Sequence, residues 1–425
     1  MWQKLEQIWK TPDLRRSILL ILGVLVVFRL GAHLPIPGVD PIALRNFFTQ
    51  NQFLGLLNLF SGGGLENFSV VMLGVGPYIT ASIIMQLLTM IVPRLEEISK
   101  DGEAGHHRIN QYTRYLTVPM AVLQGYGFIA LFRSQGGAQI VGQLDTWQLV
   151  TSLATITAGT IFLMWLGEII SERKVGNGIS LLIFAGIVAG LPRQLQQVVA
   201  TFDPTQILTV VAFLVVALIT IVGIVVVTEG QRNVPVQYAR MIRGPQASGG
   251  ATTYLPLRLL QAGVIPIIFA ISVILFPPMV AQFFARSSAD WMVRAAEFTL
   301  ELFQNQIFYG FAYFLLVFGF TYFYTAVIFK PDQIAENLQK QGGFIPGLRP
   351  GASTVEFLGY TMNRLVLPGA LFLGAIAVLP LGLQAFTGSQ ALVVGGTSLL
   401  IVVQVVIETV RQVNAQLVMR DYEEL

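Results

Sequence analysis

The sequence contains no cysteine and has few charged residues. The absence of cysteine excludes disulfide bonds, thiolate metal sites and thiol catalysis. Only 12% of the 425 residues are charged and 54% are hydrophobic, whereas a soluble domain carries about twice that charged share. The net charge of +3 is modest, so the placement of charge is more informative than its sum. This composition is typical of an integral membrane protein.

Groups for catalysis are also scarce. The three histidines are His33, His106 and His107, and no Ser, His and Asp set or His-rich cluster falls within the apolar runs. A phosphate-binding G-x-x-x-x-G-K-[ST] loop is missing. We therefore expect a protein that is not an enzyme and has no metal or cofactor. Any directed movement would then need an external energy source.

Apolar runs of about 20 residues, the length that crosses about 30 Å of hydrocarbon, recur along the chain. They predict an all-α membrane protein with ten spans, near residues 17–34, 70–92, 112–132, 149–170, 178–200, 206–228, 257–280, 307–329, 364–383 and 393–412. Ten spans place both termini on one side, where tails and loops carry 20 Lys and Arg residues against 5 on the other side. The positive-inside rule predicts that both termini are cytoplasmic. The amphipathic segment 1–16 lacks a small-residue cleavage site, so we do not expect a cleavable signal peptide.

Two longer loops, 229–256 and 331–363, lie on the predicted cytoplasmic side. The first has alternating apolar residues from Val234 to Arg240 and then paired glycines, which favours a β-hairpin over an irregular loop. The expected organisation is an N-terminal segment 1–16, spans 1–5 over 17–200, span 6 over 201–228, the hairpin 229–256, spans 7–8 over 257–330, the loop 331–363, and spans 9–10 with the tail over 364–425.

Two short strings recur in the two halves of the chain. Residues 74–81 match 263–270 as G-V-x-P-x-I-x-A, and residues 178–183 match 396–401 as G-x-S-L-L-I. The first pair joins span 2 to span 7 and the second joins span 5 to span 10, so matched helices run in opposite directions. This order predicts two five-helix halves in inverted topology, with the functional path at their interface.

The repeated strings share an isoleucine in all four spans: Ile79, Ile183, Ile268 and Ile401. Val75 and Ile187 lie one turn away. Apolar β-branched side chains that meet at one level would form a narrow collar that excludes water and ions. Ordinary packing residues of a helix bundle are the alternative interpretation.

Residues 53–68 are too short an apolar stretch to span, and Gly62, Gly63 and Gly64 would break a helix. The segment precedes span 2 on the predicted outer side. Such an element could fold back into the mouth of a pore and move out again, or it could be an interfacial loop without a gating role.

These residues resemble the bacterial SecY family over essentially the whole chain. The strings that carry the resemblance are LNLFSGG (57–63), GPYITASIIMQLL (76–88), GNGISLLIFAGIV (176–188), AGVIPIIFA (262–270), GGFIPGLRPG (342–351) and GGTSLLIVV (395–403). The resemblance implies a clamshell of two halves around a central pore, the protein-conducting channel of the general secretory pathway. The bacterial cytoplasmic membrane would be its location.

The resemblance also implies roles for individual residues. The pore ring would consist of Val75, Ile79, Ile183, Ile187, Ile268 and Ile401. The plug would include Leu56, Leu57, Asn58, Phe60, Ser61, Gly62, Gly63, Gly64, Leu65 and Phe68. Spans 2 and 3 against 7 and 8 would form a lateral gate that releases transmembrane helices into lipid, with Gln86 and Gln124 as its polar positions. Arg240, Arg243 and Arg349 would serve docking of a motor or ribosome.

Implied partners are the small membrane subunits SecE and SecG, the SecA ATPase, the ribosome, signal sequences, nascent polypeptides and the lipid bilayer. The chain departs from the family pattern in two places. The loop tip reads Gly244-Pro245-Gln246 where a basic stretch is common, which weakens the expected grip on phosphates or the motor there. The chain also ends at Leu425, earlier than the family usually does.

A secondary transporter of a small solute and a scaffold without a pore are the alternatives. A coupled transporter usually buries a carboxylate near the midplane. The ionisable residues in the predicted spans, Arg29, Glu168 and Glu408, all lie toward span ends. Backbone carbonyls could still bind Na⁺, so the transporter stays an alternative on these residues, and the resemblance favours the channel.

Overall fold

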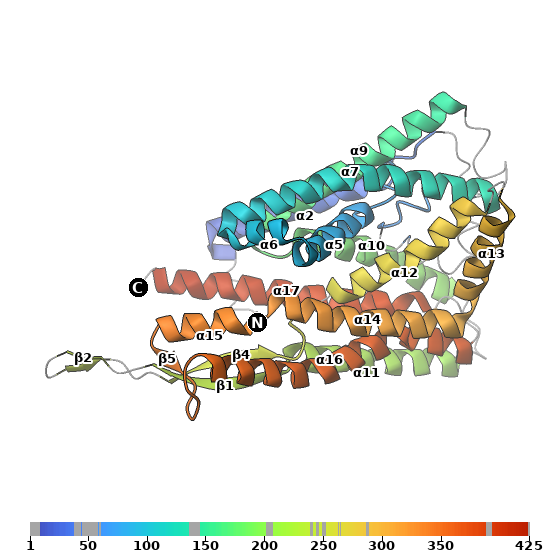
Figure 1. The fold of residues 1–425 in the computed structure, drawn as a ribbon. Coiled ribbons are helices and arrows are strands. Elements are labelled where there is room, and N and C mark those ends of the chain that lie inside the picture. The colour runs from blue at the N-terminus through green and yellow to red at the C-terminus, as the bar shows by residue number, and fades with distance from the viewer. Residues whose placement is uncertain are drawn as a thin grey trace.

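The computed structural model shows a bundle of long helices with a small β-sheet at one end (Figure 1). It describes residues 9–37, 44, 58, 61–135, 145–200, 207–238, 241–243, 246–248, 252–261, 263, 265–285, 289–387 and 393–423. We call the end with the sheet the hairpin end. The chain's C-terminal helix also ends there (Figure 1).

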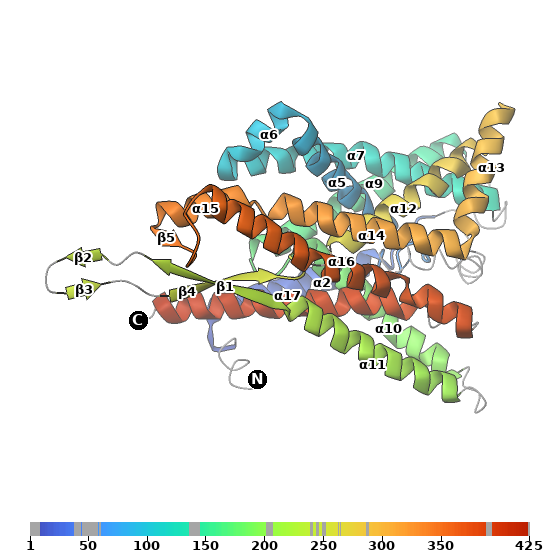
Figure 2. The same cartoon turned by 60° about the horizontal axis from the view of Figure 1, so that its bottom comes forward.

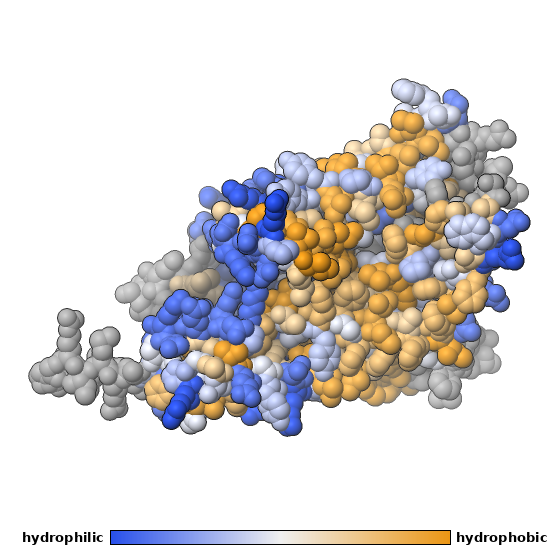
Figure 3. Space-filling view, in the orientation of Figure 1, coloured by the Kyte–Doolittle hydropathy of each residue, from blue (hydrophilic) through white to orange (hydrophobic). Residues whose placement is uncertain are grey.

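Each of the ten predicted spans overlaps a helix. These helices are α2 (Pro12–Gly31), α5 (Gly76–Ile91), α7 (Gly102–Gln135), α9 (Thr146–Glu172), α10 (Gly178–Ala200), α11 (Ile207–Glu229), α12 (Ile265–Phe284), α14 (Gln306–Ile328), α16 (Ala352–Thr387) and α17 (Val393–Glu423). Within the described residues, five helical stretches are long and apolar enough to cross a membrane, or six if the bent pair α5 and α6 is one span. Figure 3 shows an apolar band around the middle of one face, bordered by hydrophilic residues at both ends. The fold is that of a helical membrane protein.

Two predicted helix starts are wrong. Residues 61–75 form turns instead of the beginning of a helix, and α5 starts only at Gly76. The span expected from residue 257 starts at Ile265, because the strand β4 continues to Arg258. Both segments are apolar, so hydropathy predicts helix there. Hydropathy does not show that the backbone forms turns in the first segment and a strand in the second.

Other helices extend beyond the apolar runs. α7 begins at Gly102, α16 begins at Ala352 and α17 continues to Glu423, each well beyond its expected range. Hydropathy marks the part that lies in hydrocarbon, whereas a helix can continue into water as long as its backbone is hydrogen-bonded. α5 instead ends at Ile91, and the chain turns by 101° into α6 (Pro93–Lys100).

Two amphipathic helices occupy segments that were expected to be loops. α13 (Asp290–Gln304) lies across the end of the bundle opposite the sheet, and α15 (Pro331–Lys340) lies at the hairpin end (Figure 1). Their apolar residues cover one side only, so neither produced a continuous apolar run. Both connections between spans therefore contain a helix that the sequence analysis did not predict.

The predicted hairpin is present. β1 (Gln231–Tyr238) pairs antiparallel with β4 (Thr252–Arg258), β5 (Gly343–Phe344) adds to the other edge of β1, and β2 (Met241–Arg243) pairs with β3 (Gln246–Ser248) further out (Figure 2). Val234 and Val236 are buried with Leu358 and Met362 of α16, as the period of two in a strand requires. The sheet is therefore anchored to the helices.

Buried hydrophobic residues form one cluster that joins the two halves of the chain. It contains residues of α2, α5, α9, α10, α12 and α17. Two further clusters lie within the halves, one around α7 and α9 and one around α12, α14 and α16. α12 also contacts α5 and α7, and α10 contacts α17, so the first cluster lies where the two halves meet.

Candidate functional site

The internal repeat has the same backbone geometry in both halves. Gly74 has φ +58° and its repeat partner Gly263 has φ +60°, a left-handed conformation that glycine adopts without steric cost. Proline then occupies the second residue of each following helix, Pro77 in α5 and Pro266 in α12. The two helices run in opposite directions along the bundle (Figure 1), which confirms the inverted repeat.

The structure brings together the six residues predicted for the pore ring. All are between 0 and 8% exposed and belong to the cluster that joins the halves: Val75, Ile79, Ile183, Ile187, Ile268 and Ile401. Val75 directly precedes α5, and the other five residues lie in α5, α10, α12 and α17. We call these six residues the collar. All six are buried in this structure.

The glycine segment that precedes α5 reaches the collar level. A Cβ added to Gly62 would lie 2.7 Å from the Phe28 ring and 3.1 Å from the Cα of Gly186. Gly186 lies between Ile183 and Ile187 of the collar on α10. The guanidinium of Arg29 donates a hydrogen bond of 2.6 Å to the Gly62 carbonyl. The close approach requires glycine at position 62, and its φ of +68° requires it too.

The rest of this segment is held by polar contacts. The side chain of Asn58 accepts from the Glu66 backbone N–H (2.9 Å) and donates to the Glu66 carboxylate (3.0 Å). The hydroxyl of Ser61 accepts from the Leu65 N–H at 3.0 Å. The Phe68 ring packs edge-on against Phe132 of α7. The segment is therefore tied to the N-terminal half.

Three of the residues predicted for the plug, Leu56, Leu57 and Phe60, lie outside the described residues. Gly63 and Gly64 are within the described turn, and the Gly64 N–H donates to the Ser61 carbonyl.

The two glutamines predicted for the lateral gate bond within one half. Gln124 of α7 donates to the Thr80 hydroxyl of α5 at 3.2 Å, and Gln86 donates to the Ser82 hydroxyl of its own helix at 3.2 Å. Neither of these hydrogen bonds crosses to α12 or α14. Both glutamines therefore lie on the expected helices. Their hydrogen bonds do not connect the two sides of the predicted gate.

The corresponding contact in the other half is aromatic. Phe269 is the repeat partner of Thr80, and its ring packs edge-on against Phe320 and Tyr324 of α14, with centroid distances of 6.0 and 5.6 Å. Sequence reasoning missed this contact. The difference between Thr80 and Phe269 at matched positions of the repeat could have indicated this contact.

Gln404 is a polar residue that sequence reasoning also missed. It lies on α17 one turn after Ile401 and is 1% exposed, and its amide has no hydrogen-bond partner in the structure. A Cβ added to Gly263 would lie 3.8 Å from its Nε2 atom and 3.8 Å from the Glu408 carboxylate. A glutamine in the apolar run 398–407 was a visible signal.

The residues predicted for docking are separate from the collar. Arg349 is exposed between β5 and α16, and its carbonyl accepts from the Thr354 hydroxyl. Arg243 lies on β2 at the far end of the sheet, and Arg240 lies outside the described residues.

Charged residues of the spans are paired near the hairpin end. Arg114 of α7 contacts Glu168 of α9 at 2.6 Å, and Arg411 of α17 contacts Glu229 of α11 at 2.7 Å. Burial and the neighbouring Arg411 lower the pKa of Arg258, and Glu229 opposes this. Among the described residues no group of His, Asp and Glu could hold a metal ion. These pairs join helices and do not form a coupling site.

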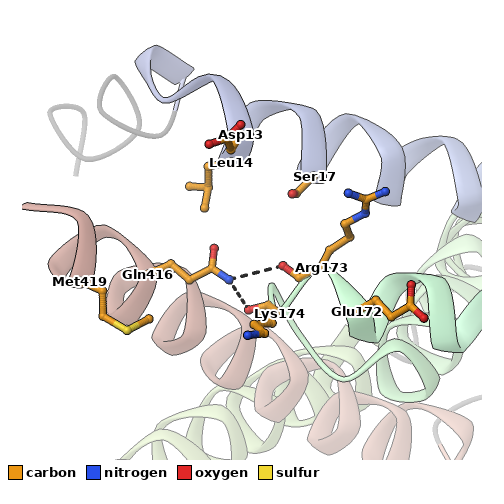
Figure 4. A pocket seen from close by; sticks show the side chains of 8 residues that line it. All are labelled: Asp13, Leu14, Ser17, Glu172, Arg173, Lys174, Gln416 and Met419. Carbon is orange, nitrogen blue, oxygen red and sulfur yellow. Dashed lines mark hydrogen bonds between the residues drawn. The ribbon is translucent and has the colours of Figure 1, made fainter. Parts of the chain in front are cut away.

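A pocket of about 320 Å³ lies at the hairpin end among α2, the turn after α9 and α17 (Figure 4). The Gln416 amide donates to the backbone carbonyls of Lys174 (2.7 Å) and Arg173 (3.4 Å) across it. Its lining residues are Asp13, Leu14, Ser17, Glu172, Arg173, Lys174, Gln416 and Met419. None of the predicted site residues lines this pocket.

Comparison with known proteins identifies the family. The family model described as SecY matches residues 69–410. The chain is 44% identical to the protein translocase subunit SecY of Streptomyces galbus over 98% of this chain and 97% of that protein, and 43% identical to that of Mycobacterium tuberculosis over 97% of each. A solved protein-conducting channel superposes with a TM-score of 0.64 at 18% identity, covering 93% of this chain and 91% of that one. Sec61 in a canine ribosome-channel complex gives a TM-score of 0.56 at 17% identity, with 93% and 91% coverage.

Proposed function

The chain belongs to the SecY family of protein translocase subunits, and we propose that polypeptides cross the membrane through its collar. Conduction of polypeptides across a membrane is the function of the family, and the subunit is not an enzyme. This assignment decides between the alternatives in favour of the channel and against the solute transporter and the scaffold.

One observation carries the proposed path. Six β-branched residues, four of them at positions matched by the inverted repeat, are buried in a single cluster where the halves meet. Such side chains offer no directional polar bonds, so they can close around any polypeptide sequence and exclude water when none is present. The resting channel is sealed by this collar.

The segment 56–68 acts as the plug. This role is supported by the close packing of Gly62 against Phe28 and the backbone of Gly186, at the level of the collar. The hydrogen bond from Arg29 holds the tip in this position. A chain that enters the collar displaces this segment toward the end opposite the hairpin.

The lateral gate lies between α5 and α7 on one side and α12 and α14 on the other. α12 contacts both α5 and α7, so parting of the halves separates these helices and opens a route from the collar to lipid. Apolar signal sequences and transmembrane helices leave by this route, because their side chains prefer lipid to water. Binding of a signal sequence there favours the open state.

The hairpin end faces the cytoplasm, and both termini lie on that side of a bacterial cytoplasmic membrane. The distribution of 20 against 5 basic residues supports this orientation. Family partners are SecE and SecG in the membrane, and SecA or the ribosome at the hairpin end, where Arg240, Arg243 and Arg349 offer positive charge. Two solved relatives are themselves ribosome-bound channels.

Disulfide crosslinking tests the path, because the chain has no native cysteine. We would introduce a single cysteine at Ile79 or Ile401 and trap a secretory chain that carries one cysteine in mid-translocation. Adducts are expected at both collar positions. The matched control is Val410, which lies on the same helix as Ile401 and is 54% exposed. Absence of adducts at both collar positions in a folded, active translocase would exclude the proposed path.

A further inference from the structure

The buried amide of Gln404 has an unusual position for an unpaired polar group. It lies one helical turn from Ile401, on the hairpin side of the collar, and its neighbour Val405 belongs to the cluster that contains the collar. Both the Nε2 and Oε1 atoms lack a partner, and only 1% of the residue is exposed. A buried amide without hydrogen bonds destabilises the state in which it is buried.

Two groups near Gln404 can form hydrogen bonds with a peptide. A Cβ atom built on Gly263 would lie 3.8 Å from the Gln404 Nε2 atom, and the Gly263 turn leads into the N-terminus of α12, where the first N–H groups have no partner within the helix. The same Cβ position lies 3.8 Å from the Glu408 carboxylate. Gln404 itself has an NH₂ group that donates and a carbonyl oxygen that accepts. A peptide group presents the complementary pair, one C=O and one N–H.

A glutamine of the other half, Gln124 on α7, differs from Gln404 because its side chain has a hydrogen-bond partner. Gln124 faces Gly76 at the start of α5, with its Oε1 atom 3.9 Å from the Cβ position, and bonds to Thr80. At the position of Thr80 the other half has Phe269, which has no polar atom to offer.

We propose that Gln404 and the Gly263 turn form a binding site for backbone peptide groups of the translocating polypeptide, immediately before the collar. The site rests on the proposed path through the collar. It is closed when the halves are together and becomes accessible when the halves part to admit a chain. Because every residue has a backbone N–H and C=O, the site accepts any sequence.

This arrangement links the presence of a polypeptide to channel opening. The amide is unpaired in the sealed state and paired in the occupied state, so Gln404 favours the occupied state over the sealed one. A residue can shift such an equilibrium only through a difference in its interactions between the two states. Replacement by leucine removes that difference and stabilises the sealed channel by about tenfold, the ratio expected for one unpaired buried amide.

The first experiment locates the polypeptide at the site. Single cysteines at Ile401, Gln404 and Val406 are tested against a series of stalled chains whose cysteine moves residue by residue. Val406 is the control on the same helix and is 43% exposed. Three helical residues rise about 4.5 Å and an extended chain advances about 3.3 Å per residue. The adduct at Gln404 should therefore form about one or two residues later in the chain than the adduct at Ile401.

The second experiment measures the equilibrium. The full-length chain, with wild-type sequence or with Gln404→Leu, is placed in planar bilayers with the subunits that copurify with it, and the ion conductance of the resting channel is recorded. Gln404→Leu should lower the frequency of spontaneous openings about tenfold and slow the start of translocation. Gln148→Leu removes a paired amide at the start of α9, outside the collar and the gate, and should not lower it.

The outcomes separate this inference from the proposed path. Adducts at Ile401 with none at Gln404, or unchanged opening with Gln404→Leu, would overturn the peptide site and leave the path intact. Absence of adducts at Ile401 would overturn the path itself. Adducts at both positions, with the expected offset and reduced opening, would establish the site.

Discussion

The two halves of the channel share a backbone and differ in the contacts that hold their gate helices. In the N-terminal half, α5 and α7 are joined by the hydrogen bond between Gln124 and Thr80. In the C-terminal half, α12 and α14 are joined by the ring contacts of Phe269 with Phe320 and Tyr324. A hydrogen bond requires one geometry, whereas ring contacts tolerate small displacements. The repeat thus preserves the turns and not the contact chemistry.

The largest expected effect comes from removing the aromatic contact. Phe269→Ala removes a buried ring and should lower the free energy of unfolding by about 3 kcal/mol. Thr80→Val at the matched position removes one hydrogen-bond partner and should cost about 1 kcal/mol. Unfolding in detergent micelles, followed by tryptophan fluorescence, measures both. Equal losses of unfolding free energy in the two variants would contradict the proposed difference in contact chemistry between the halves.

An intermediate and equal effect is expected at the two glycine turns. Gly74→Ala and Gly263→Ala each force a side chain into a left-handed conformation and should cost about 1–2 kcal/mol. Asparagine tolerates this conformation better, so Gly74→Asn and Gly263→Asn are the matched controls and should lose less. The same unfolding measurement applies. A loss at only one turn would show that the halves do not share the constraint.

The smallest effect is expected for the ion pairs, which both halves have at the hairpin end. Double-mutant cycles for Arg114 with Glu168 and for Arg411 with Glu229 should give coupling energies of about 0.2–1 kcal/mol, because all four side chains are partly exposed. The coupling should fall further in about 1 M salt, where the screening length is about 3 Å. A coupling that does not respond to salt would show that a pair is sheltered from water.

Much of this architecture could be predicted from the sequence, because length and hydropathy mark helices that must lie in lipid. The hairpin followed from periodicity and the inverted order from the two recurring strings. Four collar residues were predicted from matched positions and the full set from the family resemblance, and the structure places all six in one cluster. Their role in conduction remains a prediction.

What could not be predicted depends on contacts between distant parts of the chain or on backbone conformation. The partner of Gln124 lies 44 residues away, and the absence of a partner for Gln404 follows from the packing of three helices. α13 and α15 were missed because their apolar residues cover only one face. The late start of α5 follows from the Gly74 turn, which hydropathy does not record.

The seat of Gly62 against Phe28 and the backbone of Gly186 has a consequence for how this channel can vary. Every other amino acid brings at least a Cβ atom to position 62, and there is no room for that atom. In the proposed plug, a substitution at this position loosens the seat and leaves the resting membrane leakier to ions. A cell with such a change would then be expected to lose part of its ion gradients while secretion continues.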